Sequence, residues 1–163
     1  MVFRLEVIRL FIIIFAALVI IGAVFFIVSY NEKKSGVLEI RDTQSGNVYG
    51  KWSLNTTREF AIEFVHSVHQ SPVRESFIIE NGMICPISVR FSSFGAGMQS
   101  DLEEGQILSR DDDAIIITGF STSFRELNYI VGTVSDHLLI INGETLSLRE
   151  LCGRNAQITI RIK

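Results

Sequence analysis

The chain has few cysteines and no stretch in which basic residues alternate with aromatic ones. Its two cysteines, Cys85 and Cys152, allow a single disulfide, whose loop of nearly 70 residues would add about 4 kcal/mol of stability. The sequence leaves open whether they pair or remain separate buried thiols. Because basic segments are missing and residues 35–163 carry a net charge near −5, nucleic acid and anionic lipid are poor candidate partners.

Several other signatures are also absent. The acidic clusters "DLEE" and "DDD" lack the spacing of an EF-hand loop, so they are expected to be solvated turns. The glycine-containing stretch "SSFGAGMQS" lacks the ending of a phosphate-binding Walker loop and the features of a dinucleotide fingerprint. No repeat with a period of 20 to 50 residues is visible. We therefore expect no cofactor, and no motif predicts a resident metal.

One long hydrophobic stretch is present near the N-terminus. Residues 10–30, "LFIIIFAALVIIGAVFFIVSY", contain no charged residue. About 20 apolar residues in a helix cross a bilayer, and no small-residue cleavage pattern follows, so the stretch predicts an uncleaved transmembrane anchor. The expected organisation is a short cytoplasmic tail at 1–9, the anchor at 10–30, a linker at 31–36 and an extracytoplasmic β domain at 37–163. The protein is thus expected in the cell membrane with a single pass.

After the linker the sequence has the pattern of short strands. Runs of four to nine residues rich in Ile, Val, Phe and Thr alternate with turn residues. The pairs Asn81-Gly82 and Asn142-Gly143 predict tight hairpins, and "SLRELCG" predicts one helical turn that stops at Gly153. Pro86 predicts an edge strand or a bulge. The predicted class is all-β: an antiparallel β-sandwich or a partly open β-barrel behind one transmembrane helix.

The stretch "FVHSVHQSPVRESF" places polar residues inside an apolar hairpin. If residues 69–72 form the connection, antiparallel register sets His66 opposite Glu75 and Phe64 opposite Phe77, with all four on the core-facing side. Such a His–Glu pair fixes the register, lines a ligand pocket, or acts in acid–base chemistry. His66 and His69 point to opposite faces of a strand, which disfavours a metal site. Ser67 points away from His66, which disfavours a Ser–His dyad.

The two unusual segments together resemble a known family. "HSVHQSPVRESF" and, some 20 residues later, "SFGAG" are similar to the motifs of domain of unknown function 1850. The matching positions are His66, Ser67, Val68, Ser71, Pro72, Val73, Glu75 and Phe77, followed by Ser93, Phe94, Gly95, Ala96 and Gly97. His69 departs from the pattern.

What the resemblance implies is limited, because the family has no established activity. Its members are bacterial and archaeal and often lie beside, or are fused to, TRAP transporter permeases of the TAXI type. The implied role is an extracytoplasmic accessory component of solute uptake, with a TRAP permease or a TAXI solute-binding protein as partner. The alternatives are an enzyme that uses the His66–Glu75 pair and a purely structural scaffold of a membrane complex.

Both motifs contain residues that are too polar or too small to be explained by packing alone, so we expect them to form one site. The site would bind a small carboxylate or a segment of the transporter. Its predicted residues are His66, Ser67, Ser71, Pro72, Glu75, Ser93, Phe94, Gly95 and Gly97. No catalytic residue is assigned.

Overall fold

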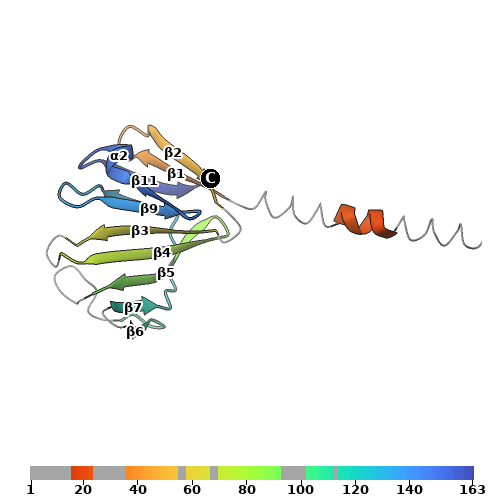
Figure 1. Ribbon diagram of the computed structural model, residues 1–163, viewed down its shortest axis with the longest axis horizontal. Coiled ribbons are helices and arrows are strands. Elements are labelled where there is room, and N and C mark those ends of the chain that lie inside the picture. Colours follow the sequence, from red (N-terminus) through yellow and green to blue (C-terminus); the bar gives the residue numbers. More distant parts are fainter. Residues whose placement is uncertain (1–15, 24–35, 55–57, 67–69, 93–101, 112–113) are drawn as a thin grey trace, which may run out of the picture. The chain divides into compact units, whose positions relative to one another are not determined.

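The chain divides into two compact units, residues 1–35 and 36–163, in a computed structural model (Figure 1). The structure describes residues 16–23, 36–54, 58–66, 70–92, 102–111 and 114–163. In the first unit residues 16–23 are helical. No helix in the described part of the chain is long and apolar enough to cross a membrane. The rest of the predicted anchor at 10–30 lies outside the described residues, so the anchor stays a prediction.

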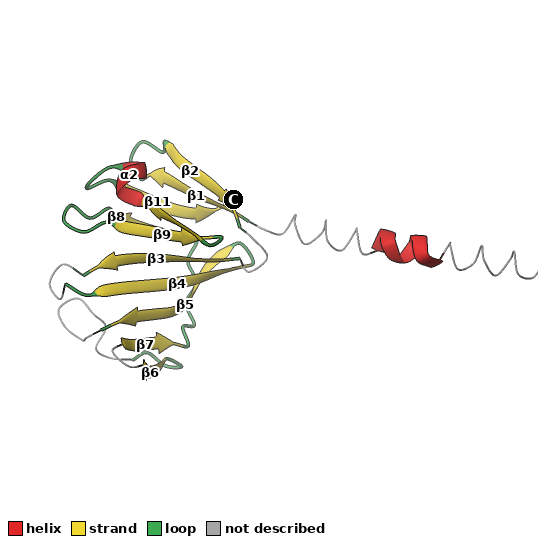
Figure 2. Cartoon of the chain, in the orientation of Figure 1, coloured by secondary structure: helices red, strands yellow, loops and turns green. Residues whose placement is uncertain are grey.

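The second unit is built from two antiparallel sheets and, in its described part, has one short helix, α2 (Leu148–Cys152) (Figure 2). The smaller sheet has the strand order β2-β1-β11-β8, and the larger has β10-β9-β3-β4-β5-β7-β6. The strands of the smaller sheet are β1 (Val37–Asp42), β2 (Val48–Ser53), β8 (Glu126–Ile130) and β11 (Gln157–Ile162). Those of the larger sheet are β3 (Glu59–Val65), β4 (Pro72–Glu80), β5 (Met83–Phe91), β6 (Ile107–Asp111), β7 (Ala114–Thr118), β9 (His137–Ile141) and β10 (Glu144–Ser147).

The core lies between the two sheets. Alternate residues of each strand point inward, so apolar side chains of both sheets meet in one cluster. This cluster includes Leu38, Ile40, Ile158 and Ile160 of the smaller sheet and Phe60, Ile62, Phe77, Ile79, Leu139 and Ile141 of the larger one. The sheets do not join into a closed ring of strands. The predicted all-β, antiparallel class is confirmed, and the described strands form two sheets that share this core.

Local sequence signals account for several connections. Asn81-Gly82 joins β4 to β5 and Asn142-Gly143 joins β9 to β10, and all four residues have φ between 51° and 83°. This left-handed backbone is what a two-residue hairpin needs, and Asn and Gly adopt it most readily. Helix α2 begins after Ser147, whose hydroxyl accepts a hydrogen bond from the Glu150 amide, and it stops at Gly153. These three predictions are confirmed.

Pro86 lies at a bulge rather than on an edge strand. The register of β4 and β5 shifts between Ser76 and Phe77, and Phe77 faces Pro86. β5 lies between β4 and β7, but it pairs with β7 only from Val89 to Phe91. Pro86 therefore needs no ladder partner on that side, which is where a residue without an N–H is tolerated.

The two cysteines do not form a disulfide. Cys85, in β5, and Cys152, at the end of α2, are both free thiols that are partly buried. The sequence left open whether the two cysteines pair or remain separate thiols, and in the structure they are separate thiols. The core between the sheets holds the fold together without a covalent link.

Candidate functional site

The β3–β4 hairpin has a different register from the predicted one. Glu75 lies opposite Ile62, and Phe64 lies opposite Val73, so the predicted pairing of His66 with Glu75 is wrong. β3 ends at Val65 and β4 begins at Pro72, which makes the connection longer than four residues.

The physical reason for the different register is the turn itself. The Gln70 amide donates to the His66 carbonyl, and the His66 amide donates to the Ser71 carbonyl. Gln70 has a left-handed φ of 49°. The chain thus reverses direction between His66 and Ser71. The register changes by an even number of residues, so each side chain keeps its predicted face.

Glu75 therefore lies on the core-facing side of β4, as predicted, but with another partner. The Tyr129 hydroxyl donates a hydrogen bond of 2.5 Å to Oε2 of Glu75. Tyr129 is on β8, so the bond joins the two sheets. Burial raises the pKa of Glu75, and the hydrogen bond from Tyr129 opposes this only in part. Burial also raises the pKa of Tyr129, so its hydroxyl keeps its proton and acts as the donor.

His137 is the third polar member of this group. It lies opposite Phe64 in the β9–β3 ladder, and the two rings stack with centroids 4.9 Å apart. The Tyr129 ring meets the imidazole edge-on, at 6.2 Å between centroids. The Gly132 amide donates to Nδ1 of His137 over 3.1 Å, so the neutral ring carries its proton on Nε2. Burial lowers the pKa of His137 and so favours this neutral form.

The loop between β8 and β9 holds His137 in place through a set of hydrogen bonds. Asp136 accepts from the Ser147 hydroxyl at 2.5 Å and from the Arg149 amide at 3.0 Å. The Arg149 guanidinium donates to the Gly132 carbonyl, and the Ser135 hydroxyl donates to the Val65 carbonyl. The loop is thereby tied both to α2 and to the end of β3. We call Glu75, Tyr129 and His137 the inter-sheet cluster.

The family described as domain of unknown function (DUF1850) matches residues 60–148, more than half of the chain. The chain belongs to this family. The match runs from β3 to the start of α2 and includes all three residues of the inter-sheet cluster. No curated protein and no solved structure matches the chain.

The DUF1850 motif residues that the structure describes lie along the β3–β4 hairpin. His66 and Ser71 are in the turn, Pro72 begins β4, and Glu75 is on the core-facing side of β4. Ser67, Ser93, Phe94, Gly95 and Gly97 lie outside the described residues. The predicted convergence of the two motifs therefore stays a prediction. Within the described ranges, no three His, Cys, Asp or Glu side chains are grouped as metal ligands would be.

Two members of the inter-sheet cluster were not predicted from the DUF1850 sequence. Tyr129 belongs to an ordinary strand pattern, "NYIVGTV", and His137 begins the strand "HLLII". Alternation alone would place Tyr129 on the core-facing side, because it is two residues from Leu127 and Val131. Which residue of the opposite sheet it meets depends on how the sheets stack, and no local pattern carries that information.

Proposed function

We propose that this DUF1850 protein is a membrane-anchored extracytoplasmic binding module of a solute uptake system. The observation that carries the binding role is the inter-sheet cluster, in which a carboxyl, a phenol and an imidazole meet among apolar side chains. Small-ligand sites combine apolar walls with a few placed polar groups in this way. Phe64 forms one such wall, because its ring stacks on His137.

The protonation states favour an anionic ligand group. His137 accepts at Nδ1 and is neutral, so Nε2–H is a donor. Burial raises the pKa of Glu75, so this carboxyl takes up a proton more readily than an exposed one and, when protonated, is a second donor. Two such donors suit a small carboxylate, which accepts hydrogen bonds through both oxygens. The negative charge of Asp136, beside His137, is engaged by the Ser147 hydroxyl and the Arg149 amide.

The alternative of an enzyme that uses His66 and Glu75 has less support. His66 follows the end of β3 and is four residues from Ile62, which is the residue opposite Glu75. At about 3.4 Å per residue this is a displacement of about 14 Å along the chain, too far for direct proton transfer. A binding role needs no such contact.

A thermal-shift titration of the purified full-length chain with a set of small carboxylates tests the binding role. A bound ligand raises the melting temperature in proportion to the logarithm of its concentration over its dissociation constant. Glu75→Met and His137→Phe should abolish the shift, since each removes the donor while keeping roughly the size of the side chain. Arg74→Gln is the matched control, because Arg74 is the exposed neighbour of Glu75 on the other face of β4. An equal shift in all four proteins would reject the inter-sheet cluster as the site.

The anchor and the transporter partner need separate tests. We propose that residues 10–30 span the membrane and that the β domain works beside a TRAP permease or a TAXI solute-binding protein; the absence of charge in residues 10–30 and the family resemblance support this. The full-length chain should resist extraction by alkaline carbonate, and its β domain should be digested by protease added outside the cell. The named transporter components should co-purify from native membranes. A protected β domain would reject the extracytoplasmic orientation.

A further inference from the structure

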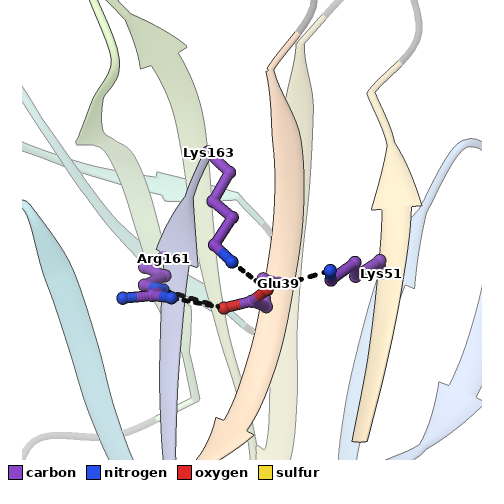
Figure 3. A network of polar contacts seen from close by, with 4 residues as sticks. All are labelled: Glu39, Lys51, Arg161 and Lys163. Atoms are coloured by element: carbon purple, nitrogen blue, oxygen red, sulfur yellow. Dashed lines mark hydrogen bonds and ion pairs between the residues drawn. The ribbon is translucent and has the colours of Figure 1, made fainter. Parts of the chain in front are cut away.

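A buried carboxylate lies on the outer face of the smaller sheet (Figure 3). Glu39 alternates with Leu38 and Ile40, which face the core, so its side chain points to the opposite face. Even so, it is 0 % exposed. Its neighbours in the ladder are Lys51 on β2 and Arg161 on β11. A single carboxylate on an outer face would ordinarily be solvated, so the side chains that cover Glu39 are the unusual feature.

Three cations from two parts of the chain, Lys51 and the pair Arg161 and Lys163, cover this carboxylate. Arg161 donates to Oε1 through Nε at 2.9 Å and lies 2.7 Å from it through Nη2. Nζ of Lys163 lies 2.9 Å from Oε2, and Nζ of Lys51 lies 3.5 Å from it. We call Lys51, Arg161 and Lys163 the cation triplet. The Lys163 and Arg161 contacts lower the pKa of Glu39 to about 2, so it is ionised at neutral pH.

The charge of the cation triplet exceeds what Glu39 needs. One cation would neutralise the carboxylate, and the triplet leaves a surplus of two positive charges. The carboxylate is covered, whereas the side chains of Lys51, Arg161 and Lys163 are 52 %, 30 % and 49 % exposed. The surface therefore presents positive charge to solvent at this place, although residues 35–163 are acidic overall. Glu126 lies directly opposite Arg161 in the β11–β8 ladder, so its carboxylate offsets one of the two surplus charges and a net positive charge remains.

The place of the cation triplet in the fold, close to the start of the β domain, indicates which anions it meets. β1 begins at Val37, and the amide and carbonyl of Val37 bond to those of Lys163. The uncharged stretch 10–30 ends seven residues before Val37, and seven extended residues span at most about 25 Å. The triplet is thus held near any membrane that contains this stretch. Lys33 and Lys34 lie in the intervening residues and, with Glu32, give these residues a net charge of +1.

We propose that the cation triplet binds the phosphate groups of anionic lipids in the membrane that holds residues 10–30. This proposal rests on the proposed anchor. It revises the expectation that anionic lipid is a poor partner, which came from the absence of basic runs in the sequence. Lys51 lies far from Arg161 and Lys163 in the chain, and the pairing of β2, β1 and β11 brings it to them. Glu39 holds them side by side against their mutual repulsion.

The experiment uses the full-length chain in lipid nanodiscs and measures acetylation of lysines by mass spectrometry. Lys51 and Lys163 should react more slowly in discs that contain phosphatidylglycerol than in discs of phosphatidylcholine alone. Salt at about 0.5 M should remove the difference, because an ionic strength of that order screens the attraction between surface charges. Lys163→Gln should reduce the protection of Lys51 about fivefold, because each basic residue near an anionic surface contributes about 1 kcal/mol. Arg161 still neutralises Glu39 in that variant.

Arg110→Gln is the matched control, since it removes one exposed positive charge from β6 of the other sheet and should leave the protection unchanged. Equal acetylation rates in both kinds of disc would overturn the proposal. Inorganic phosphate added to neutral discs distinguishes the source of the anion: full protection by free phosphate would overturn the assignment to lipid. A chain that does not co-elute with discs would overturn the anchor and the lipid contact together, whereas an inserted but unprotected chain would overturn only the contact.

Discussion

The hydroxyl of Tyr129 lies 2.5 Å from Oε2 of Glu75, and this hydrogen bond joins strands of opposite sheets. Apolar side-chain packing and a hydrogen bond from the Asn142 side chain to the Ser53 carbonyl also join the two sheets. A directional bond in such surroundings restricts how one sheet can slide over the other, whereas apolar contacts tolerate small displacements. The position of the sheets around the inter-sheet cluster should therefore depend on this pair.

Removing the donor should destabilise the fold. Tyr129→Phe leaves the buried Glu75 without its hydrogen bond, which costs about 1–3 kcal/mol in the free energy of unfolding. Urea denaturation measures this cost. Tyr49→Phe is the control, because the Tyr49 hydroxyl bonds to Asp42 at 3.2 Å while the amides of Gln44 and Ser45 also bond to that carboxylate. We expect Tyr49→Phe to cost less than about 0.5 kcal/mol, in the range of ordinary surface changes. Equal costs in the two variants would contradict the special role of Glu75.

Glu75 should make the protein less stable as the pH rises. Its pKa is raised in the folded state above the ordinary value of 4.5, so the folded protein binds this proton more tightly than the unfolded chain does. The stabilising contribution is complete below pH 4.5 and is lost as the pH rises through the folded-state pKa. Glu75→Gln mimics the protonated form and should lose this dependence. The urea midpoints of the parent protein and of Glu75→Gln should be measured from about pH 4 to about pH 8. The two midpoints should move apart as the pH rises, with the variant more stable relative to the parent at high pH. Parallel curves would rule out the raised pKa.

Glu39 should have the opposite effect. Its pKa is lowered from 4.5 to about 2 in the folded state, chiefly by the contact with Lys163. Its contribution is complete above pH 4.5 and is lost as the pH falls toward 2. The free energy of unfolding of Glu39→Gln should therefore fall less steeply than that of the parent protein as the pH is lowered from 4.5 toward 2. Acid titration followed by circular dichroism measures the difference, and Glu126→Gln, at an exposed position of the same sheet, serves as the control. An unchanged acid transition in Glu39→Gln would contradict the lowered pKa.

The cysteines should react as two separate thiols. Without reductant, the unfolded protein should take up two alkyl groups, because Cys85 and Cys152 are unpaired. In the folded protein Cys152 should react slowly at about pH 8, which is close to the pKa of an ordinary thiol. The reason is that burial raises the pKa of Cys152 to about 11, so little of the reactive thiolate is present. Mass spectrometry after timed alkylation measures both. A species that takes up label only after reduction would show that a disulfide forms.

Much of the fold can be predicted from local patterns, because they act over few residues. Asn81-Gly82 and Asn142-Gly143 dictate their own backbone angles, and alternation within β4 places Glu75 on the core-facing side. The register of the β3–β4 hairpin was not predictable from face matching. A shift of the register by any even number of residues leaves each side chain on the same face of its strand. The hydrogen bonds of the turn from His66 to Ser71 determine which of these registers forms.

The polar groups were less predictable than the strands. Nothing near Glu39 in the sequence shows that Lys51, Arg161 and Lys163 cover it, because the three cations come from both ends of the domain. His137 likewise acquires its tautomer from the amide of Gly132, five residues earlier in an irregular loop. Such contacts depend on how the sheets and loops come together, which no local pattern specifies.

The paired hydrogen bonds between Val37 and Lys163 also have a mechanical consequence. Because β1 and β11 are antiparallel, residue 37 and residue 163 lie side by side, and the bonds that join the two strands run across them. A force that pulls these two residues apart acts along those bonds and opens the ladder one pair at a time, from the edge inward. Tension between the segment before residue 37 and anything held at residue 163 would thus unzip the smaller sheet and release the cations from Glu39 at its first steps.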